Sequence, residues 1–245
     1  MSAAITPDVS SVPRTIADYG HVSWLAIESF PVAGPNGLPD RWVSFSGTHP
    51  EILLALDRRE VNLAILHWDL PEHLTGSVLT PLLAAAPFTA VAKGEPVSIP
   101  DQLARLLPAP APADLLQDIE DLAAMFSILD RYRGDVRVRL QAQIHKGRTH
   151  WHADFFGLRM LCTHRGQGTE RLSLEGGAEA AERPSRVRPP SATGQIPIGA
   201  VAVMKDEGHP DTRGSACIHR SPWDYPGLGA RLLPRIDQPD GDLDE

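Results

Sequence analysis

The sequence predicts an α+β protein. Its second half is expected to fold as a double-stranded β-helix, the cupin-like jelly roll, behind an N-terminal, mainly helical cap. The spacing of apolar residues changes from a helical period to alternation near residue 135, and strand-sized segments then follow one another to residue 236. In the same half a His-x-Asp motif precedes a distant histidine, as expected when ligands from two strands meet at a barrel mouth.

Composition divides the chain into four regions. Residues 1–20 are predicted to be disordered or frayed, and residues 21–112 to form the α/β cap region. Residues 113–237 form the predicted β-rich, metal-binding jelly roll, and residues 238–245 an acidic tail. The Pro-Ala alternation that ends at Pro112 cannot be helical and makes a stiff connector, which is why the boundary is placed there.

Within the cap region, the strongest local signals predict one helix and one strand. Thr48 offers a helix cap, Pro50 suits a first turn, and Glu51 places a carboxylate at the helix start, so residues 48–57 are predicted to be helical. Residues 61–66 are an apolar run typical of a buried strand. Residues 20–27 and 41–46 alternate weakly and are expected to be short strands or extended connections.

The second half begins with a helix and continues as strands. Asp114 can cap a helix whose apolar residues are spaced by four and three, which keeps one face buried until Gly134. The apolar residues of that face are Leu115, Ile119, Leu122, Phe126 and Leu129. The predicted strands are 136–142, 158–163, 198–204, 216–219 and 230–236. Residues 166–194, which are poor in apolar side chains, are predicted to form a mobile flap.

Charge and composition exclude several classes of function. The chain has 245 residues, 42% of them hydrophobic, and a net charge of −8, which argues against general binding to nucleic acid or anionic membranes. Neither a membrane span nor a secretory signal is visible, so a cytoplasmic protein acting on a small molecule or peptide is expected. Two cysteines, Cys162 and Cys217, are too few for a disulfide framework.

The His-x-Asp motif predicts a metal site. His152 and Asp154 share one face of a strand because residues two apart point the same way, and His219 can complete the set. Two imidazoles and one carboxylate leave coordination positions open, which suits a non-haem Fe(II) that must bind a co-substrate and dioxygen. Cys217 lies two residues before His219, so its side chain can point the same way, and its thiol would give a four-donor set better suited to Zn(II). A buried thiol that only packs in the core is more frequent.

A second His-x-Asp motif is expected to be a decoy. His67 and Asp69 stand at a predicted strand end before a turn and have no matching distal histidine. The more ordinary interpretation is therefore that they mark the end of a strand that enters a turn before Leu70-Pro71.

An arginine one strand beyond the distal histidine suggests a co-substrate anchor. Arg231 could present its guanidinium fork to a carboxylate, and Arg235 competes for that role because Pro234 interrupts the strand. Thr163 is a candidate hydrogen-bonding residue of the same site.

Several of these strings together resemble a known family. His152-Ala-Asp, residues 158–170 and 199–205, His219-Arg-Ser-Pro and Arg231-Leu-Leu are similar to the bacterial domain-of-unknown-function family 1826, over most of the chain from about Val61. The β half resembles, more distantly, the Fe(II)- and 2-oxoglutarate-dependent oxygenases. That resemblance implies an iron centre held by the two histidines and the aspartate, with Arg231 on the distal carboxylate of 2-oxoglutarate. The alternatives are a non-catalytic protein of metal homeostasis, binding Zn or Fe, and a metal-free jelly roll that binds a small molecule.

Overall fold

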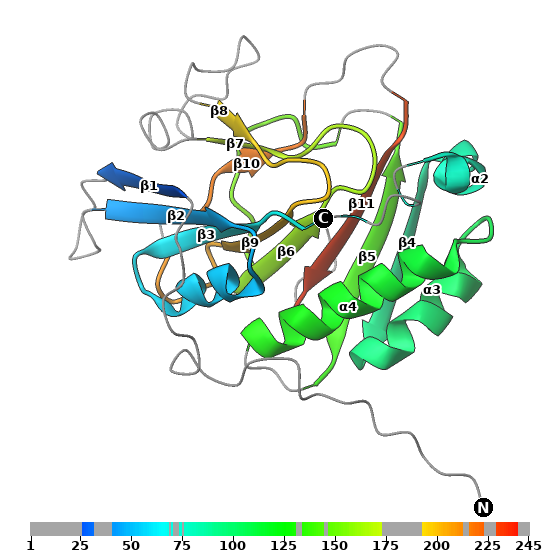
Figure 1. The fold of residues 1–245 in the computed structure, drawn as a ribbon, viewed down its shortest axis with the longest axis horizontal. Coiled ribbons are helices and arrows are strands. Elements are labelled where there is room, and N and C mark those ends of the chain that lie inside the picture. The colour runs from blue at the N-terminus through cyan, green and yellow to red at the C-terminus, as the bar shows by residue number, and fades with distance from the viewer. Residues whose placement is uncertain are drawn as a thin grey trace, which may run out of the picture.

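The chain forms two β-sheets and a layer of helices (Figure 1). This computed structural model describes residues 26–31, 41–68, 70, 74, 76–130, 134–144, 147–172, 193–212, 216–222 and 229–239. The predicted frayed N-terminus and nearly all of the acidic tail lie outside these residues, as does most of the predicted flap.

The larger sheet has eight strands in the order β1-β2-β3-β9-β6-β11-β5-β4. It is mixed, because β2 and β3 run parallel while the other neighbours are antiparallel. Its strands are β1 (Ala26–Pro31), β2 (Arg41–Gly47), β3 (Val61–Leu66), β4 (Phe88–Gly94), β5 (Val136–Gln143), β6 (Leu158–Cys162), β9 (Val201–Lys205) and β11 (Arg231–Asp237).

The smaller sheet carries His219, one of the predicted ligands. It contains β7 (Glu170–Leu172), β8 (Thr193–Gln195) and β10 (His219–Arg220), in the order β10-β7-β8. An isolated antiparallel bridge between His152 and His219 adds a fourth segment beside β10. The two histidines, far apart in the sequence, are therefore paired through their backbones.

Helices cover one face of the larger sheet. In Figure 1, α3 (Ile99–Leu106) and α4 (Ala113–Leu129) lie across β4, β5 and β11. Between them and the sheet lies the main hydrophobic core, to which α4 contributes Leu115, Ile119, Leu122 and Phe126. The remaining helical segments are short: η3 (Pro50–Asp57), η4 (Ser77–Leu79), α2 (Thr80–Ala84) and η5 (Pro96–Ser98).

A second, smaller core lies on the other face of the larger sheet. It joins side chains of β3, β6, β9 and β11 to residues that flank the smaller sheet. Its members are Leu63, Ile65, Leu161, Ile196, Ala200, Ala202, Met204, Cys217 and Leu233. Alternate residues of the central strands thus serve two different cores.

The structure confirms most of the predicted elements. The predicted helix from Asp114 is α4, and the predicted strands 61–66, 136–142, 158–163 and 230–236 match β3, β5, β6 and β11. Residues 50–57 form a 3-10 helix instead of an α-helix. Its buried pairs, Ile52 with Leu53 and Ala55 with Leu56, repeat every three residues, which matches the three-residue turn of that helix.

The prediction of a mainly helical N-terminal cap is wrong for the described part of the chain. β2 and β3 extend one side of the large sheet, and β4 forms its opposite edge. The alternation in β4 escapes notice in the sequence because its buried residues, Ala90 and Ala92, are small. Apart from α3, which packs on the sheet, the helices in this region are short links, and strands from both sides of residue 112 share one sheet.

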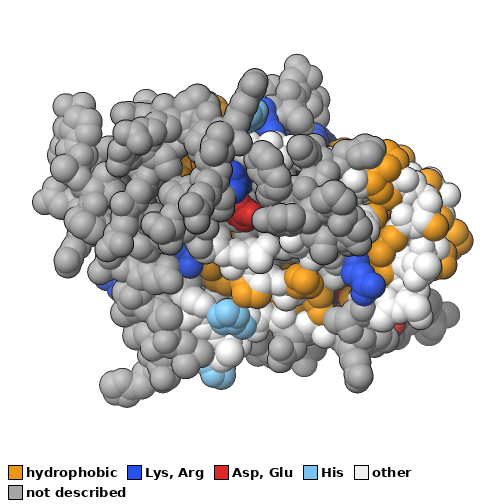
Figure 2. Space-filling view, turned by 90° about the horizontal axis from the view of Figure 1, so that it is seen from above, with side chains coloured by type: hydrophobic (Ala, Val, Ile, Leu, Met, Phe, Trp, Pro, Cys, Tyr) orange, Lys and Arg blue, Asp and Glu red, His pale blue; other side chains and the backbone are white. Residues whose placement is uncertain are grey.

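The surface of the described part shows few large apolar side chains. Seen from above, hydrophobic side chains gather on the side of the molecule where α2 lies (Figure 2), and Val78 in η4 is 41% exposed. None of the helices in the described part has the length and apolar character needed to cross a membrane.

Candidate metal centre

Three predicted donors converge beside the smaller sheet. The Nε2 atom of His219 lies 3.2 Å from Oδ2 of Asp154, and Nε2 of His152 lies 3.6 Å from Oδ1 of the same carboxylate. One donor atom from each residue can be chosen so that all lie within 4.8 Å of one another. Donors about 2.1 Å from one metal at right angles would be about 3 Å apart, so the arrangement is close to one face of a coordination polyhedron.

Backbone carbonyl groups orient both imidazoles. Nδ1 of His152 lies 2.7 Å from the carbonyl oxygen of His150, and Nδ1 of His219 lies 3.1 Å from that of Cys217. Since a carbonyl can only accept, each Nδ1 carries the proton and donates it. Each Nε2 therefore keeps its lone pair and faces the Asp154 carboxylate, as a metal ligand must.

The environment favours neutral imidazoles. Burial, followed by the neighbouring His219, lowers the pKa of His152 to about 4. Burial also lowers the pKa of His219. Metal binding requires deprotonated imidazole nitrogen, so this donor set fits a divalent cation without any prior loss of protons at neutral pH.

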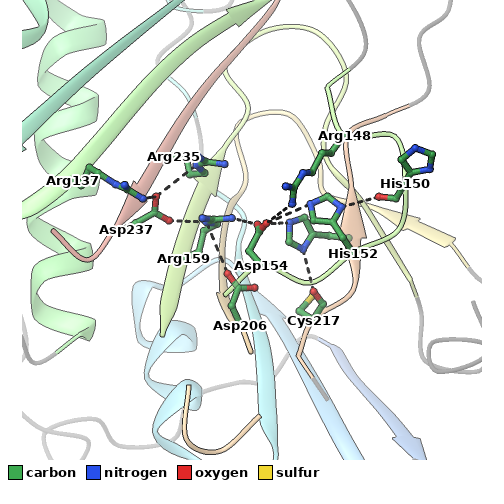
Figure 3. Close-up of polar contacts among 11 residues, drawn as sticks. Arg137, Arg148, His150, His152, Asp154, Arg159, Asp206, Cys217, Arg235 and Asp237 are labelled. Carbon is green, nitrogen blue, oxygen red and sulfur yellow. Dashed lines mark hydrogen bonds and ion pairs between the residues drawn. The ribbon is translucent and has the colours of Figure 1, made fainter. Parts of the chain in front are cut away.

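A buried network of charges holds the Asp154 carboxylate. Figure 3 shows Arg159 between Asp154 and Asp237, with Asp206 below it. Arg159 contacts Oδ2 of Asp154, and its Nε lies 2.6 Å from Oδ1 of Asp237. The more exposed Arg148 approaches Oδ1 of Asp154 at 3.5 Å. Arg159 thus fixes the Asp154 carboxylate from inside the protein.

Arg231 and Arg235 lie on the same face of β11. The register of β11 with β5 runs unbroken through Pro234, so the proline does not rotate the strand. Arg231 is 7% exposed and donates hydrogen bonds from Nη2 to Oγ1 of Thr169 (2.7 Å) and of Thr163 (3.3 Å). Arg235 lies further along the strand, with its Nε 3.6 Å from Oδ2 of Asp237. Only Arg231 contacts the predicted Thr163.

The backbone beside Arg231 requires a glycine. Gly166 has a φ of 86°, and a Cβ atom there would lie 2.9 Å from Cα of Arg231. Any larger residue would push against the start of β11.

Two other predicted candidates lie outside the cluster. Among the described residues, the donor group contains His152, Asp154 and His219 but not Cys217, whose buried thiol belongs to the smaller core. Burial raises the pKa of that thiol to about 12. His67 instead contacts Oγ of Ser46 at 2.6 Å, and Asp69 lies outside the described residues.

Several charged residues of the core were missed in the sequence. Arg159 and Leu161 are two residues apart on β6, so their side chains point to the same face of the sheet. Because Leu161 lies in the smaller core, an inward-pointing Arg159 could have been recognised. Nε2 of His164, a residue that the sequence analysis did not single out, is buried and lies 2.6 Å from Oδ2 of Asp118 on α4. Counting every second residue from Met160 and Cys162, whose side chains lie in the main hydrophobic core, leads to His164. This alternation could have indicated that His164 is buried.

Structural comparison finds weak similarity to proteins that include dioxygenases. A dioxygenase for auxin oxidation from rice is 14% identical, with 72% of each chain covered and a TM-score of 0.43. A Neurospora crassa protein in complex with alpha-KG is 13% identical, with 77% of each chain covered and a TM-score of 0.42. The 2-oxoglutarate complex of dioxygenase for auxin oxidation 1 from Arabidopsis thaliana is 14% identical, covers 80% of this chain and 78% of that chain, and has a TM-score of 0.39. Likeness at this level assigns no activity.

The sequence itself identifies a family. No curated protein matches the chain. The family model described as "Protein of unknown function (DUF1826)" matches residues 47–237. Because that match spans most of the chain, the protein belongs to the DUF1826 family.

Proposed function

We propose that this protein is an Fe(II)- and 2-oxoglutarate-dependent oxygenase in which His152, Asp154 and His219 hold the iron. The observation that carries the proposal is the convergence of two Nε2 atoms and one carboxylate without a fourth protein donor in their group, among the described residues. A structural zinc site uses four protein ligands, whereas an oxygenase needs open positions. With the Cys217 thiol outside the group, the zinc alternative loses its fourth donor.

The strand order supports a double-stranded β-helix around this site. β5, β11, β6 and β9 are consecutive in the larger sheet and would form one wall. The His152 segment, β10, β7 and β8 follow one another in the smaller sheet and would form the other wall. Two four-stranded sheets packed face to face make up a jelly roll, and the ligands then come from neighbouring strands of one wall.

Arg231 is the proposed anchor for 2-oxoglutarate. It is buried, and among the described residues no carboxylate pairs with it. Burial alone lowers its pKa to about 10, and its Nε has no hydrogen-bond partner in the described part. A buried cation without a counter-ion is costly, so an anionic ligand is expected, and the distal carboxylate of 2-oxoglutarate fits a guanidinium fork.

The residues of the chain would bind and orient the metal and the co-substrate, while the iron would supply the oxidation chemistry. When bound, Fe(II) would couple decarboxylation of 2-oxoglutarate by dioxygen to oxidation of a C–H bond of the substrate. Arg159 keeps the Asp154 carboxylate in place, and the two backbone carbonyls keep each imidazole turned toward it. Arg231, with Thr163 and Thr169, would hold the far end of the co-substrate.

The proposal is tested by metal analysis and a product assay. Protein purified without oxygen is expected to retain Fe(II) and, on addition of 2-oxoglutarate and air, to release succinate and carbon dioxide in equal amounts. The His219→Ala variant, which loses a ligand but keeps the backbone bridge, should release none. Retention of iron with no succinate from the wild type would favour a non-catalytic role in metal homeostasis.

A further inference from the structure

Asp206 is a fully buried aspartate that lies close to the candidate metal centre. It directly follows β9, and its main chain is fixed, because its N–H donates to the carbonyl of Gly157 at 3.2 Å and its own carbonyl accepts from Oγ1 of Thr212 at 2.7 Å. The next residue, Glu207, donates its backbone N–H to the carbonyl of Asp154 at 3.0 Å. The Asp206 carboxylate is therefore held inside the protein, beside the segment that carries Asp154.

This carboxylate does not stabilise the structure as it stands. Neither of its oxygens has a hydrogen-bond partner in the described part of the chain. Its only ion-pair contact among these residues, from Oδ2 to Nε of Arg159, is 3.9 Å long. A buried charge without hydrogen bonds is unfavourable, and burial accordingly raises the pKa of Asp206 to about 6. A buried polar group left in this way calls for an explanation.

Arg159 has a spare donor next to this carboxylate. Its Nε lies 2.6 Å from Oδ1 of Asp237, and its Nη1 contacts Oδ2 of Asp154. Its Nη2 is buried and has no hydrogen-bond partner in the described part of the chain. Figure 3 shows Asp206 below Arg159, with Asp154 and Asp237 to either side. An unpaired donor of a cation and an unpaired carboxylate thus adjoin each other.

A divalent cation at Asp154 would change the balance of charge around Arg159. The oxygen that Arg159 contacts, Oδ2 of Asp154, is also the one that lies 3.2 Å from Nε2 of His219. A metal held by this carboxylate would draw on its negative charge and would repel the neighbouring guanidinium group. Arg159 would then need a further acceptor, and Asp206 offers two oxygens.

From this geometry we propose that Asp206 is a positioning residue for the metal centre, whose carboxylate pairs with Arg159 when a divalent cation binds at Asp154. Nη2 of Arg159 then donates to Asp206 while Nε stays on Asp237, so Arg159 remains behind Asp154. The burial of Asp206 is compensated in the metal-bound protein and not in the metal-free protein. This inference rests on the metal centre of the proposed function, and it is independent of 2-oxoglutarate and of oxygen chemistry.

The Asp206→Asn variant of the full chain tests the proposal in both states. After removal of metal with a chelator, unfolding in guanidinium chloride measures the folding equilibrium constant, which should be no lower than that of the wild type, because asparagine removes an uncompensated charge. Titration with Co(II), followed by visible absorption, measures metal affinity. This affinity should fall about 10- to 100-fold, the range for residues that orient a metal ligand. A merely structural residue would lower the stability of the metal-free protein.

Matched variants separate these two roles. Asp237→Asn removes an equally buried aspartate that pairs with Arg159 at 2.6 Å and with Arg137 at 3.1 Å, and it should lower the folding equilibrium constant of the metal-free protein. Asp101→Asn changes an exposed aspartate of α3 and should alter neither quantity. The effects of Asp206→Asn and Arg159→Lys on Co(II) affinity should be less than additive, because Asp206 acts through Arg159.

Each outcome decides the proposal. A metal-free Asp206→Asn variant that is less stable than the wild type or does not fold would overturn it, as would unchanged Co(II) affinity or fully additive effects with Arg159→Lys. A wild type that binds no Co(II) would overturn the metal centre as well. A wild type that binds Co(II), but with Fe(II) and 2-oxoglutarate forms no succinate, would overturn the oxygenase function alone.

Discussion

At the scale of single residues, the candidate centre depends on proton positions. Each imidazole donates Nδ1–H to the carbonyl two residues earlier in the chain, His150 for His152 and Cys217 for His219. This local geometry comes from extended backbone and needs no distant side chain. The carboxylate is different, because Asp154 is held by Arg159, which is in turn held by Asp237. The candidate ligand set is therefore held in position in two independent ways, by backbone carbonyls and by Arg159.

The ligand assignment predicts a clear contrast among histidine variants. The His152→Ala and His219→Ala variants are expected to bind metal at least about 100-fold more weakly than the wild type. Mutating a residue that only orients a metal ligand typically weakens metal binding by about 10- to 100-fold. Elemental analysis of folded protein after dialysis measures the loss. His67→Ala, which removes only a contact with Ser46, should keep the wild-type metal content. Equal loss from the His67 variant would show that the wrong motif was chosen.

Arg159 is expected to act as a positioning residue for Asp154. Arg159→Lys keeps a charge but cannot span the carboxylates of Asp154 and Asp237, and should weaken Co(II) binding about 10- to 100-fold. The visible absorption of bound Co(II) should also change, because the carboxylate is no longer held in one orientation. A merely structural arginine would not alter that spectrum.

Arg148 provides the control for this experiment. It contacts the same carboxylate but is 49% exposed at its side chain, and exposed ion pairs contribute little. Arg148→Lys should therefore leave both the Co(II) affinity and the spectrum nearly unchanged. An unaltered spectrum in Arg159→Lys would remove the positioning role.

At the scale of elements, β6 joins the two cores of the protein. Arg159 and Leu161 face the smaller core and the candidate centre, whereas Met160 and Cys162 face α4. His164 continues the second set and reaches Asp118, which also accepts a hydrogen bond from Trp68. The helix layer and the strand that carries Arg159 are thus joined by a buried polar contact.

This contact predicts a pH-dependent stability. Burial opposes the charged form, but Cys162 and Asp118 raise the pKa of His164 to about 10, well above its value of 6.5 in an unfolded chain. The contribution to stability is therefore complete below pH 6.5 and is lost as the pH rises toward 10. Asp118→Asn should lower the free energy of unfolding at pH 7 by about 3–5 kcal/mol and flatten its alkaline decline.

Urea unfolding at several pH values measures both effects. Asp121→Asn, an exposed aspartate of the same helix, is the matched control and should change stability by no more than about 0.5 kcal/mol. A wild-type free energy of unfolding that stays constant from neutral pH to pH 10 would contradict the charged pair.

At the scale of the whole molecule, local periodicity identified the elements but not all of their partners. α4 and β5 could be predicted because each has a clear period of its own, and β3, β6 and β11 because each is a strand-sized segment rich in apolar residues. The N-terminal strands were assigned to a separate cap because sheet order depends on long-range pairing, such as that of β3 with β9. The convergence of His152, Asp154 and His219 could be predicted from a motif, whereas the contacts of Arg159 depend on register between strands.

One strand of the larger sheet contributes to both the proposed co-substrate site and the network behind Asp154. β11 begins at Arg231, beside Thr163 and Thr169, and ends at Asp237, which pairs with Arg159 next to the ligand carboxylate. Arg231 and the contact that holds Asp154 thus come from opposite ends of one strand. A change at Arg231 should accordingly affect 2-oxoglutarate binding without disturbing the metal.

Arg231→Lys tests this separation and decides between an oxygenase and a metal store. The lysine keeps the charge but loses the planar fork, so 2-oxoglutarate binding should weaken by about 1.5–3 kcal/mol, the range for a hydrogen bond to a charged group. Metal affinity should barely change, because Arg231 contacts none of the three donors. Calorimetric titration of the Mn(II)-loaded protein with 2-oxoglutarate, without oxygen, measures the first quantity, and competition with a chelator measures the second. If the wild type retains metal but binds no 2-oxoglutarate at millimolar concentration, the buried Arg231 serves another anion and metal homeostasis becomes the better account.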